Sequence, residues 1–335
     1  MNFIQSAVTK NVVLPKDFKI LDEGKPKKGD VILVRFVSEG EYEPTYIRDK
    51  HGEKVNLKKG LVFLSALSNR YAPTIMKAEV PEYLKKGDKI NLLARGGTTG
   101  VITEGKHNYR KAYVEFIGFV KKGDKILNIK DFSILAKDIK NIPKLIIIVG
   151  VFEGSGKTTT CENLTKGLVK KGYKVCVGKI SGLGNVIDVK KSKDKGASKI
   201  LEIVDTGYPS TVGLSKDELD EIFLKIFSNL ADENPDFILI EIADGVTQRE
   251  TSMYLKSEIV RKYDPHFIVS VLDPLGACGS LKLLEEKLNI RPLFFTGKGA
   301  ITSMARNEIE QVTGLKAFDP TTQWKEMTDY MLSLL

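Results

Sequence analysis

The chain has 335 residues, a formal net charge of +9 and 42% hydrophobic residues. This length predicts roughly two domains, and no apolar run is long enough to span a bilayer. The N-terminal segment lacks the charged start and long apolar stretch of a signal peptide. We therefore expect a cytoplasmic protein that does not associate with membranes.

The positive charge is confined to the N-terminal part. Residues 1–143 contain 27 Lys and Arg against 17 Asp and Glu, a net charge of +10, so residues 144–335 carry the remaining −1. The lysines are spread along the segment, which is typical of a solvated surface. Nucleic acid is a less favoured partner, because arginine clusters and interleaved aromatic residues are missing. Cys161, Cys176 and Cys278 lack metal-binding spacing and are expected to be reduced core residues.

Residues 1–140 are predicted to form a β-rich domain. Short runs of β-forming residues alternate with Lys-Lys-Gly turns, in which glycine supplies the positive φ. The runs lie at 31–37, 61–67, 89–93, 112–120 and 125–129, and they predict a β-barrel or a β-sandwich. The loops 69–73 and 95–100 could present polar groups to a ligand, but a plain loop and a bulged hairpin are the favoured interpretations.

A phosphate-binding loop begins the second domain, residues 141–335. Five aliphatic residues at 145–149 predict a strand buried on both faces, and a glycine-rich turn and a helix follow. Lys157 can bridge the terminal phosphates of a nucleotide, and Thr158 can offer a hydroxyl to Mg²⁺. The residues expected to hold the nucleotide are Gly150, Glu153, Gly154, Ser155, Gly156, Lys157, Thr158 and Thr159.

Strand and helix patterns alternate from this loop to the end of the chain, which predicts a doubly wound parallel α/β sheet. Further strands are expected at 174–180, 236–242, 267–272 and 292–296. A helix is expected from Asp217 to about Asn234, capped by Ser215 or Asp217. The run that ends at Asp205 is helix-like.

Glu241 is the second chemical signal, at the end of the run Phe-Ile-Leu-Ile-Glu. An acidic residue at the carboxyl end of a parallel strand beside the phosphate-binding strand lies where Mg²⁺ has to bind. Thr158 and Glu241 are therefore predicted metal ligands.

The phosphate-binding loop has five residues between Gly150 and Gly156, one more than the common motif. In this it resembles the loop of dethiobiotin synthetase and its relatives, within the SIMIBI class of P-loop proteins. Glu241 and Gly245 are similar to that family's Glu-Gly-x-Gly-Gly segment, with Asp244 in place of a glycine. Residues 144–320 also resemble an uncharacterised P-loop family linked to D-amino-acid catabolism, through Glu-Ile-Ala-Asp-Gly, Gln-x-Glu-Thr and Thr-Gly-Lys-Gly.

The resemblance implies roles for two polar loops. The segment 178–185 is similar to the stretch with which dethiobiotin synthetase holds its acid substrate, which would give Lys179 that role. The loop 205–211 could offer Asp205 as a further Mg²⁺ contact, with Asp188 and Asp194 as alternatives. An ordinary solvent-exposed turn is an equal interpretation of both loops.

Together these features predict an ATP- and Mg²⁺-dependent enzyme that phosphorylates or ligates a small acid or amine, with Lys157, Glu241 and Lys179 as catalytic residues. ATP is favoured because the guanine-reading pattern Asn/Thr-Lys-x-Asp is not present. A regulatory or assembly NTPase switch and a nucleic-acid 5′-hydroxyl kinase are the alternatives, the latter because some such kinases carry a β domain before the loop. We expect a homodimer.

Overall fold

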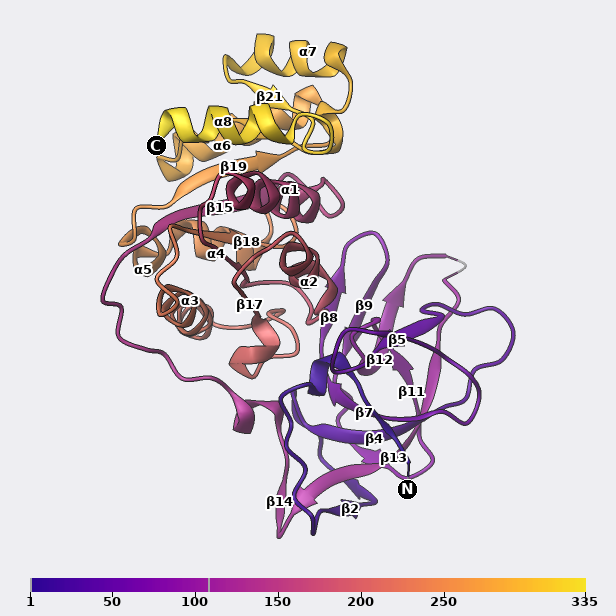
Figure 1. Cartoon of the computed structure of the whole chain (residues 1–335). Coiled ribbons are helices and arrows are strands. Elements are labelled where there is room, and N and C mark those ends of the chain that lie inside the picture. Colours follow the sequence, from indigo (N-terminus) through magenta and orange to yellow (C-terminus); the bar gives the residue numbers. More distant parts are fainter. Residues whose placement is uncertain (1, 108) are drawn as a thin grey trace. The chain divides into compact units, whose positions relative to one another are not determined.

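The computed structural model describes residues 2–107 and 109–335 (Figure 1). Its internal contacts divide the chain into two compact units. Unit 1 consists of Met1–Leu135, Leu183–Ile187 and Ile203–Gly213, and unit 2 of Ala136–Gly182, Asp188–Glu202 and Leu214–Leu335. Two short segments from the second half of the chain thus pack within the N-terminal unit. No helix in the described ranges is long and apolar enough to cross a membrane.

Unit 1 is a mainly antiparallel β structure, which confirms the predicted β-rich domain. Its elements are β1 (Ile4–Gln5), η1 (Ala7–Thr9), β2 (Lys19–Leu21), β3 (Glu23–Gly24), β4 (Val31–Phe36), β5 (Tyr46–Arg48), β6 (Lys54–Asn56), β7 (Val62–Leu67), β8 (Arg70–Ala72), β9 (Met76–Glu79), β10 (Leu84–Lys85), β11 (Lys89–Leu92), β12 (Thr98–Gly105), β13 (Tyr113–Lys122), β14 (Lys125–Ile126), η2 (Ile129–Phe132) and η3 (Ile203–Thr206).

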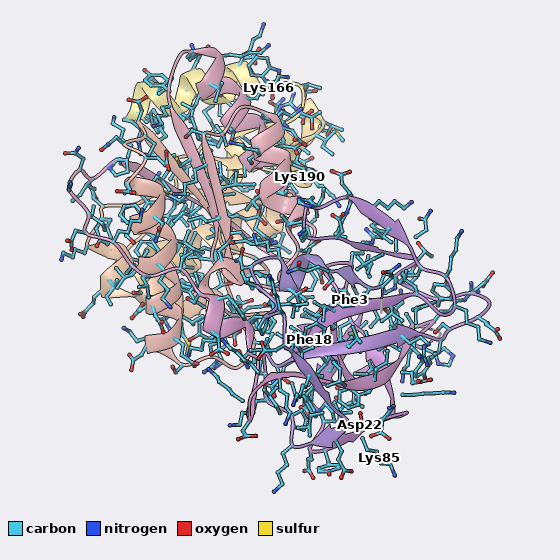
Figure 2. All side chains as sticks on the ribbon, turned by 60° about the horizontal axis from the view of Figure 1, so that its bottom comes forward. Phe3, Phe18, Asp22, Lys85, Lys166 and Lys190 are labelled. Atoms are coloured by element: carbon cyan, nitrogen blue, oxygen red, sulfur yellow. The ribbon has the colours of Figure 1, made fainter. Side chains whose placement is uncertain are left out.

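The main strands of unit 1 pair around a closed circuit. β7, β4, β13, β11 and β12 are neighbours in that order, and β12 pairs again with β7 in parallel, with Thr98 opposite Ala66. The buried side of this circuit is filled by large apolar side chains, among them Phe116 and Phe119, whose ring centroids lie 4.9 Å apart. At the N-terminus, Phe3 and Phe18 make an edge-to-face contact at 6.3 Å (Figure 2).

Unit 2 contains a parallel sheet in the order β17-β16-β18-β15-β19-β20-β21. The strands are β15 (Lys144–Gly150), β16 (Val175–Lys179), β17 (Lys199–Glu202), β18 (Phe237–Glu241), β19 (His266–Ser270), β20 (Phe295–Thr296) and β21 (Ala317–Phe318). β15 lies between β18 and β19, so the strand that precedes the glycine-rich loop is central and buried on both faces, as predicted.

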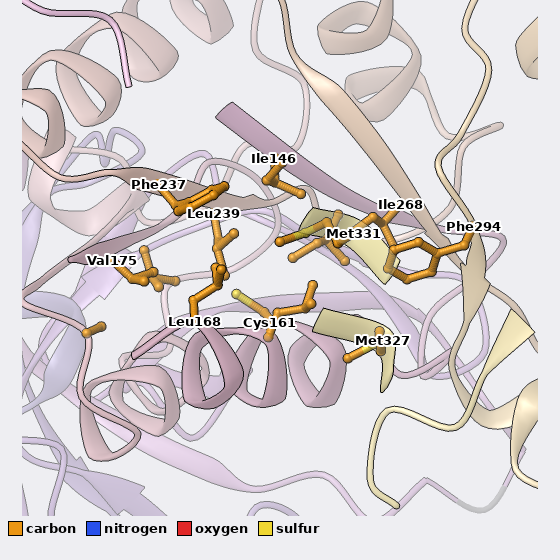
Figure 3. Close-up of a cluster of buried hydrophobic side chains, with 14 of the residues drawn as sticks. Ile146, Cys161, Leu168, Val175, Phe237, Leu239, Ile268, Phe294, Met327 and Met331 are labelled. Carbon is orange, nitrogen blue, oxygen red and sulfur yellow. The ribbon is translucent and has the colours of Figure 1, made fainter. Parts of the chain in front are cut away.

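Helices cover both faces of this sheet. They are α1 (Lys157–Lys170), α2 (Ile187–Asp194), α3 (Lys216–Ala231), α4 (Arg249–Lys256), α5 (Glu258–Arg261), α6 (Pro274–Leu288), η4 (Lys298–Ala300), α7 (Ser303–Thr313) and α8 (Trp324–Leu334). α1 and α8 pack on one face, where Cys161 and Leu168 of α1 meet Ile146, Leu239 and Met331 (Figure 3). On the other face, a Cβ on Gly178 of β16 would come within 2.8 Å of Ile226 of α3.

The structure confirms several predicted elements and corrects others. Ser215 caps α3 with a capping box, as its spacing to Glu218 favours. The helix-like run that ends at Asp205 is only partly helical: Ile203–Thr206 form the 3-10 helix η3, whereas residues 199–202 form β17, a strand too short for its period to show in the sequence. Cys161 and Cys176 are buried, but the prediction for Cys278 was wrong, because this residue is exposed.

Candidate functional site

The loop between β15 and α1 is built so that no side chain blocks its interior. Gly154 and Gly156 adopt φ values of 75° and 113°, which a side chain would oppose. A Cβ on Gly150 would lie 2.3 Å from Ser155 Oγ and 3.0 Å from Lys157 Nζ. The Ser155 hydroxyl is buried and has no hydrogen-bond partner within the described chain. An unpartnered buried donor inside a glycine-lined loop at a helix N-terminus is suited to a phosphate group.

Lys157, the first residue of α1, closes this loop. Its ammonium donates hydrogen bonds to the carbonyl oxygens of Phe152 at 3.0 Å and Asp244 at 2.8 Å, and the residue is only 6% exposed. Burial lowers the pKa of the Lys157 ammonium, against the opposing attraction of the Glu241 and Asp244 carboxylates. The lysine therefore already lies at the loop and is held there by backbone carbonyls.

Two glycine segments, one after β18 and one after β20, lie against the loop. A Cβ on Gly245, after β18, would lie 2.5 Å from the Val151 carbonyl oxygen, and one on Gly297, after β20, would lie 2.4 Å from that of Ser155. The Lys298 amide donates to Ser155 O at 2.8 Å. The Thr-Gly-Lys-Gly run at 296–299 is the sequence pattern that marks this contact. Its glycines are needed because the two backbones touch.

Asp244 stands where the resembling family has a glycine, and it adopts a glycine-like conformation. Its φ is +66°, in the left-handed region that only a few non-glycine residues, aspartate among them, tolerate. Its carbonyl oxygen is the one that holds Lys157. Burial raises the pKa of the Asp244 carboxyl. The Asp244 backbone thus takes a conformation that glycine adopts freely, and in it the carbonyl oxygen accepts the hydrogen bond from Lys157.

Thr158, Glu241 and Lys179 meet at the carboxyl edge of the sheet. The Thr158 hydroxyl donates to Glu241 Oε1 at 3.2 Å, and Lys179 Nζ lies 3.7 Å from the same oxygen. Lys179 also forms an ion pair with Asp188 at the start of α2. Parallel register explains the meeting, because Lys179 ends β16 opposite both Glu241 of β18 and Glu202 of β17.

These charged groups are buried, with exposed fractions of 8% for Lys179, 4% for Glu241 and 1% for Glu202. Burial opposes the charge of Lys179, but the Asp188 and Glu241 carboxylates outweigh it and raise the pKa of the ammonium. Burial raises the pKa of the Glu241 carboxyl above its ordinary value, although Lys179 acts against this shift. Glu241 is thus a buried carboxylate beside Lys179 and Lys157. It is well suited to exchange one of these two lysines for a metal ion as its partner.

Mg²⁺ fits the oxygen atoms present here. No group of three or more His, Cys, Asp or Glu side chains in residues 2–107 and 109–335 is arranged to hold a metal. A metal at this site would instead use the Thr158 hydroxyl and the Glu241 carboxylate together with phosphate oxygens, which is the usual mode for Mg²⁺. Asp188, ion-paired to the same lysine as Glu241, is the nearest further carboxylate among the alternatives that the sequence left open.

Asp205 has partners of its own in unit 1. Its carboxylate accepts hydrogen bonds from Lys10 Nζ at 3.0 Å and Asn11 Nδ2 at 2.9 Å. The loop 203–213 also pairs with the segment 183–187, because the Gly184 amide donates to the Pro209 carbonyl at 2.9 Å. A metal role for Asp205 stays a prediction, and the observed contacts give this carboxylate a structural use.

Two predicted nucleotide-binding residues and the arginine that begins α4 are placed as follows. Glu153 lies half-buried in the loop, and Thr159 lies in the first turn of α1, where its carbonyl accepts a hydrogen bond from Asn163. Arg249 begins α4 and donates to the Leu214 carbonyl at 3.0 Å and to Glu250 at 2.9 Å. These contacts engage the Arg249 guanidinium locally, within unit 2.

No protein-family model matches the sequence, and no curated protein matches it either. Among solved structures, the chain is similar to the signal recognition particle receptor FtsY from Elizabethkingia anophelis in complex with GDP, with 18% identity and a TM-score of 0.39 over 52% of this chain and 55% of that one. It is also similar to the signal recognition particle 54 kDa protein from Aeropyrum pernix K1 in complex with GDP, with 19% identity and a TM-score of 0.38 over 59% and 49% of the two chains.

Cell division protein FtsY from Thermotoga maritima gives 19% identity and a TM-score of 0.37 over 59% of this chain and 64% of that one. In each case the matched region spans less than two thirds of the other chain. These similarities therefore do not indicate a function, and any functional proposal has to rest on the residues of the site.

Proposed function

We propose that this chain is a Mg²⁺-dependent P-loop enzyme that transfers the terminal phosphoryl group of ATP to a small acid or amine. The observation that supports it best is the hydrogen bond between Thr158 and Glu241, 3.2 Å long, in the first turn of the helix that Lys157 begins. Two oxygen ligands for a divalent cation thus adjoin a buried lysine and an open ring of backbone amides.

In this proposal the chain acts mainly by position and charge. The loop amides 154–159 and the α1 N-terminus hold the phosphates, and Lys157 moves from the Phe152 and Asp244 carbonyls to the transferring phosphoryl group. Thr158 and Glu241 would hold Mg²⁺, with Asp188 or Asp205 as a further ligand; the ion supplies charge neutralisation at the phosphates when bound. Fixed groups of this kind favour the transition state because they need no reorganisation.

Lys179 is the residue proposed to position the acceptor. Release from Asp188 or Glu241 on metal binding would leave its ammonium available to a carboxylate of the substrate. The similarity of its loop to that of dethiobiotin synthetase supports an acid substrate. ATP is proposed over GTP because the strand ends after β19 and β20 lack the guanine-reading pattern. Membership of the SIMIBI class and a homodimer are part of the same proposal.

Nucleotide-induced stabilisation tests the proposal at its first step. The denaturation midpoint of the full chain is measured with ATP, GTP and Mg²⁺, for the wild type and for Lys157→Ala. A nucleotide at a hundredfold excess over its Kd should raise stability by about 2.7 kcal/mol. Lys282→Ala removes an exposed lysine of α6 and serves as the control. Equal stabilisation of Lys157→Ala and the control would overturn the proposal.

A nucleotide-dependent switch is the second candidate, and a specific observation favours it. The segments 183–187 and 203–213 belong to unit 1, yet each is joined in sequence to a charged residue beside Lys179. The first segment is followed by Asp188, and the second is preceded by Glu202. Binding that moves these residues would pull on segments anchored in the β-rich unit. Incubation with ATP and candidate acids separates the two functions: an enzyme gives a phosphorylated acceptor, and a switch gives only inorganic phosphate.

A further inference from the structure

Three cations of unit 1 surround one aromatic ring. The guanidinium carbons of Arg48 and Arg95 lie 5.2 and 4.6 Å from the centroid of the Tyr46 ring, and Lys54 Nζ lies 4.8 Å from it. We call Tyr46, Arg48, Lys54 and Arg95 the Tyr46 cluster. The cluster cannot be recognised in the sequence, because its cations come from β5, from β6 and from the loop before β12. Only folding brings them together.

The fold itself fixes the cluster. β5 and β6 form an antiparallel pair in which Arg48 lies directly opposite Lys54. The Arg48 amide donates to the Arg95 carbonyl at 2.7 Å, which joins the third cation to the same place. Like charges directly opposite each other across a strand pair are unfavourable, so this arrangement needs a compensating charge.

No ion pair in the described part of the chain supplies that charge. None of the three cations takes part in an ion pair within residues 2–107 and 109–335. Arg48 Nη1 donates to the Gly52 carbonyl at 3.0 Å, whereas its Nε is buried and has no hydrogen-bond partner in the described part. Lys54 and Arg95 are exposed. The ring holds the cations by their attraction to its π face, and it leaves their positive charge uncompensated.

A similar trio of cations surrounds a ring in unit 2, and one of the three has a local explanation. Lys166, Lys170 and Lys325 lie 4.2 to 5.5 Å from the centroid of the Trp324 ring. There Lys170 stands in the last turn of α1, where a cation complements the negative end of the helix dipole. The Tyr46 cluster lies on short strands and has no such dipole beside it.

We propose that the Tyr46 cluster is a binding site for the phosphates of a single-stranded nucleic acid. Residues 1–135, which make up most of unit 1, carry 25 Lys and Arg against 16 Asp and Glu, and this net charge of +9 would attract an extended polyanion more strongly than a single small anion. Guanidinium planes accept stacked bases as well as phosphates, so the two arginines can contact both parts of an unpaired strand. This proposal concerns unit 1 alone and is independent of the nucleotide site.

Fluorescence anisotropy of a labelled single-stranded RNA of about 15 nucleotides tests it. The full chain is titrated at several salt concentrations without added ATP. The variant Arg48→Gln/Arg95→Gln should bind at least about tenfold more weakly, and its salt dependence should be shallower by about 1.4, since each phosphate contact adds about 0.7. The control Lys89→Gln/Lys122→Gln removes the same charge from exposed lysines of β11 and β13 and should bind within about twofold of wild type.

Two further measurements keep the test decisive. Arg48→Lys/Arg95→Lys should recover part of the affinity through its charge, and the Gln variant should unfold in a cooperative transition like that of the wild type, which shows that it is folded. Competition by inorganic phosphate as effective as that by unlabelled RNA, at equal phosphate concentration, would identify a small-anion site and overturn the proposal. Tighter binding of duplex than of single-stranded RNA, no binding by the wild type, or equal loss in the control would also overturn it.

Discussion

The ammonium of Lys157 donates a 2.8 Å hydrogen bond to the carbonyl oxygen of Asp244, whose own backbone lies in the left-handed region. The residue that closes the phosphate-binding loop is thus held by a residue in a strained conformation. Strain at such a place is typical of a functional site, because the surrounding structure has to maintain it.

Asp244→Gly should relieve this strain without moving the carbonyl. Glycine adopts a φ of +66° at no steric cost, so we expect a gain in unfolding free energy of up to about 1 kcal/mol, with nucleotide binding retained. Chemical denaturation measures the gain. Asp244→Ala is the control, because it removes the same carboxylate but keeps the unfavourable φ. Equal stabilities of the two variants would argue against a contribution from the backbone.

Glu241→Gln should remove the dependence of nucleotide binding on Mg²⁺. The amide keeps the size of the side chain and can still accept from Thr158, but it is a poor ligand for a hard cation. We expect the affinity for ATP in the presence of Mg²⁺ to fall by about tenfold or more, ~1.4 kcal/mol. Calorimetry with and without Mg²⁺ measures this. Glu286→Gln removes an exposed carboxylate of α6 and should leave the effect of Mg²⁺ intact.

Binding of Mg²⁺ and nucleotide should weaken in mild acid. In the proposed site Mg²⁺ would bind the deprotonated carboxylate of Glu241, and burial raises the pKa of this group above its ordinary value. Protonation therefore competes with the metal as the pH falls through the raised pKa, at a higher pH than for an ordinary glutamate. We measure the nucleotide affinity in the presence of Mg²⁺ from neutral pH downward. Its decline with pH should have a slope that corresponds to the uptake of one proton per site. In Glu241→Gln this decline should be absent.

Asp205→Asn distinguishes two uses of one carboxylate. The ion pair of Asp205 with Lys10 is mostly buried, with side-chain exposures of 9% and 15%, so its loss should cost about 1–3 kcal/mol of stability. Asp232→Asn breaks an exposed ion pair with Lys137 and should change stability little. Unchanged stability of Asp205→Asn together with a loss of Mg²⁺ dependence would favour the metal role for this residue.

Gly96→Ala should destabilise the contact between the 95–100 loop and the segment 183–187. A Cβ on Gly96 would lie 2.2 Å from the Gly184 carbonyl oxygen, and backbone cannot yield as a flexible side chain does. The expected cost is about 1–3 kcal/mol in thermal or chemical unfolding. Gly279→Ala lies in α6 with open space around it, and there alanine should be neutral or stabilising by up to about 1 kcal/mol.

The sequence was informative where a single segment carries the signal. The buried run before Gly150, a helix capped at Ser215 or Asp217 and the acidic end of β18 could all be predicted from local patterns, and the structure has the strands and the helix, with Ser215 as the cap. The strand β17 was missed because four residues give too little periodicity. The Tyr46 cluster was also missed. Its cations lie on separate strands and in a loop, so the charges and the aromatic ring become neighbours only through strand pairing.

The assignment of 183–187 and 203–213 to unit 1 bears on how this molecule can be dissected. The chain passes between its units five times, after Leu135, Gly182, Ile187, Glu202 and Gly213. A single cut therefore cannot release either half intact: a fragment that starts at residue 136 would carry two loops stripped of the surfaces they fold against. Any recombination that exchanges the N-terminal half for another would have to redesign those two loops with it.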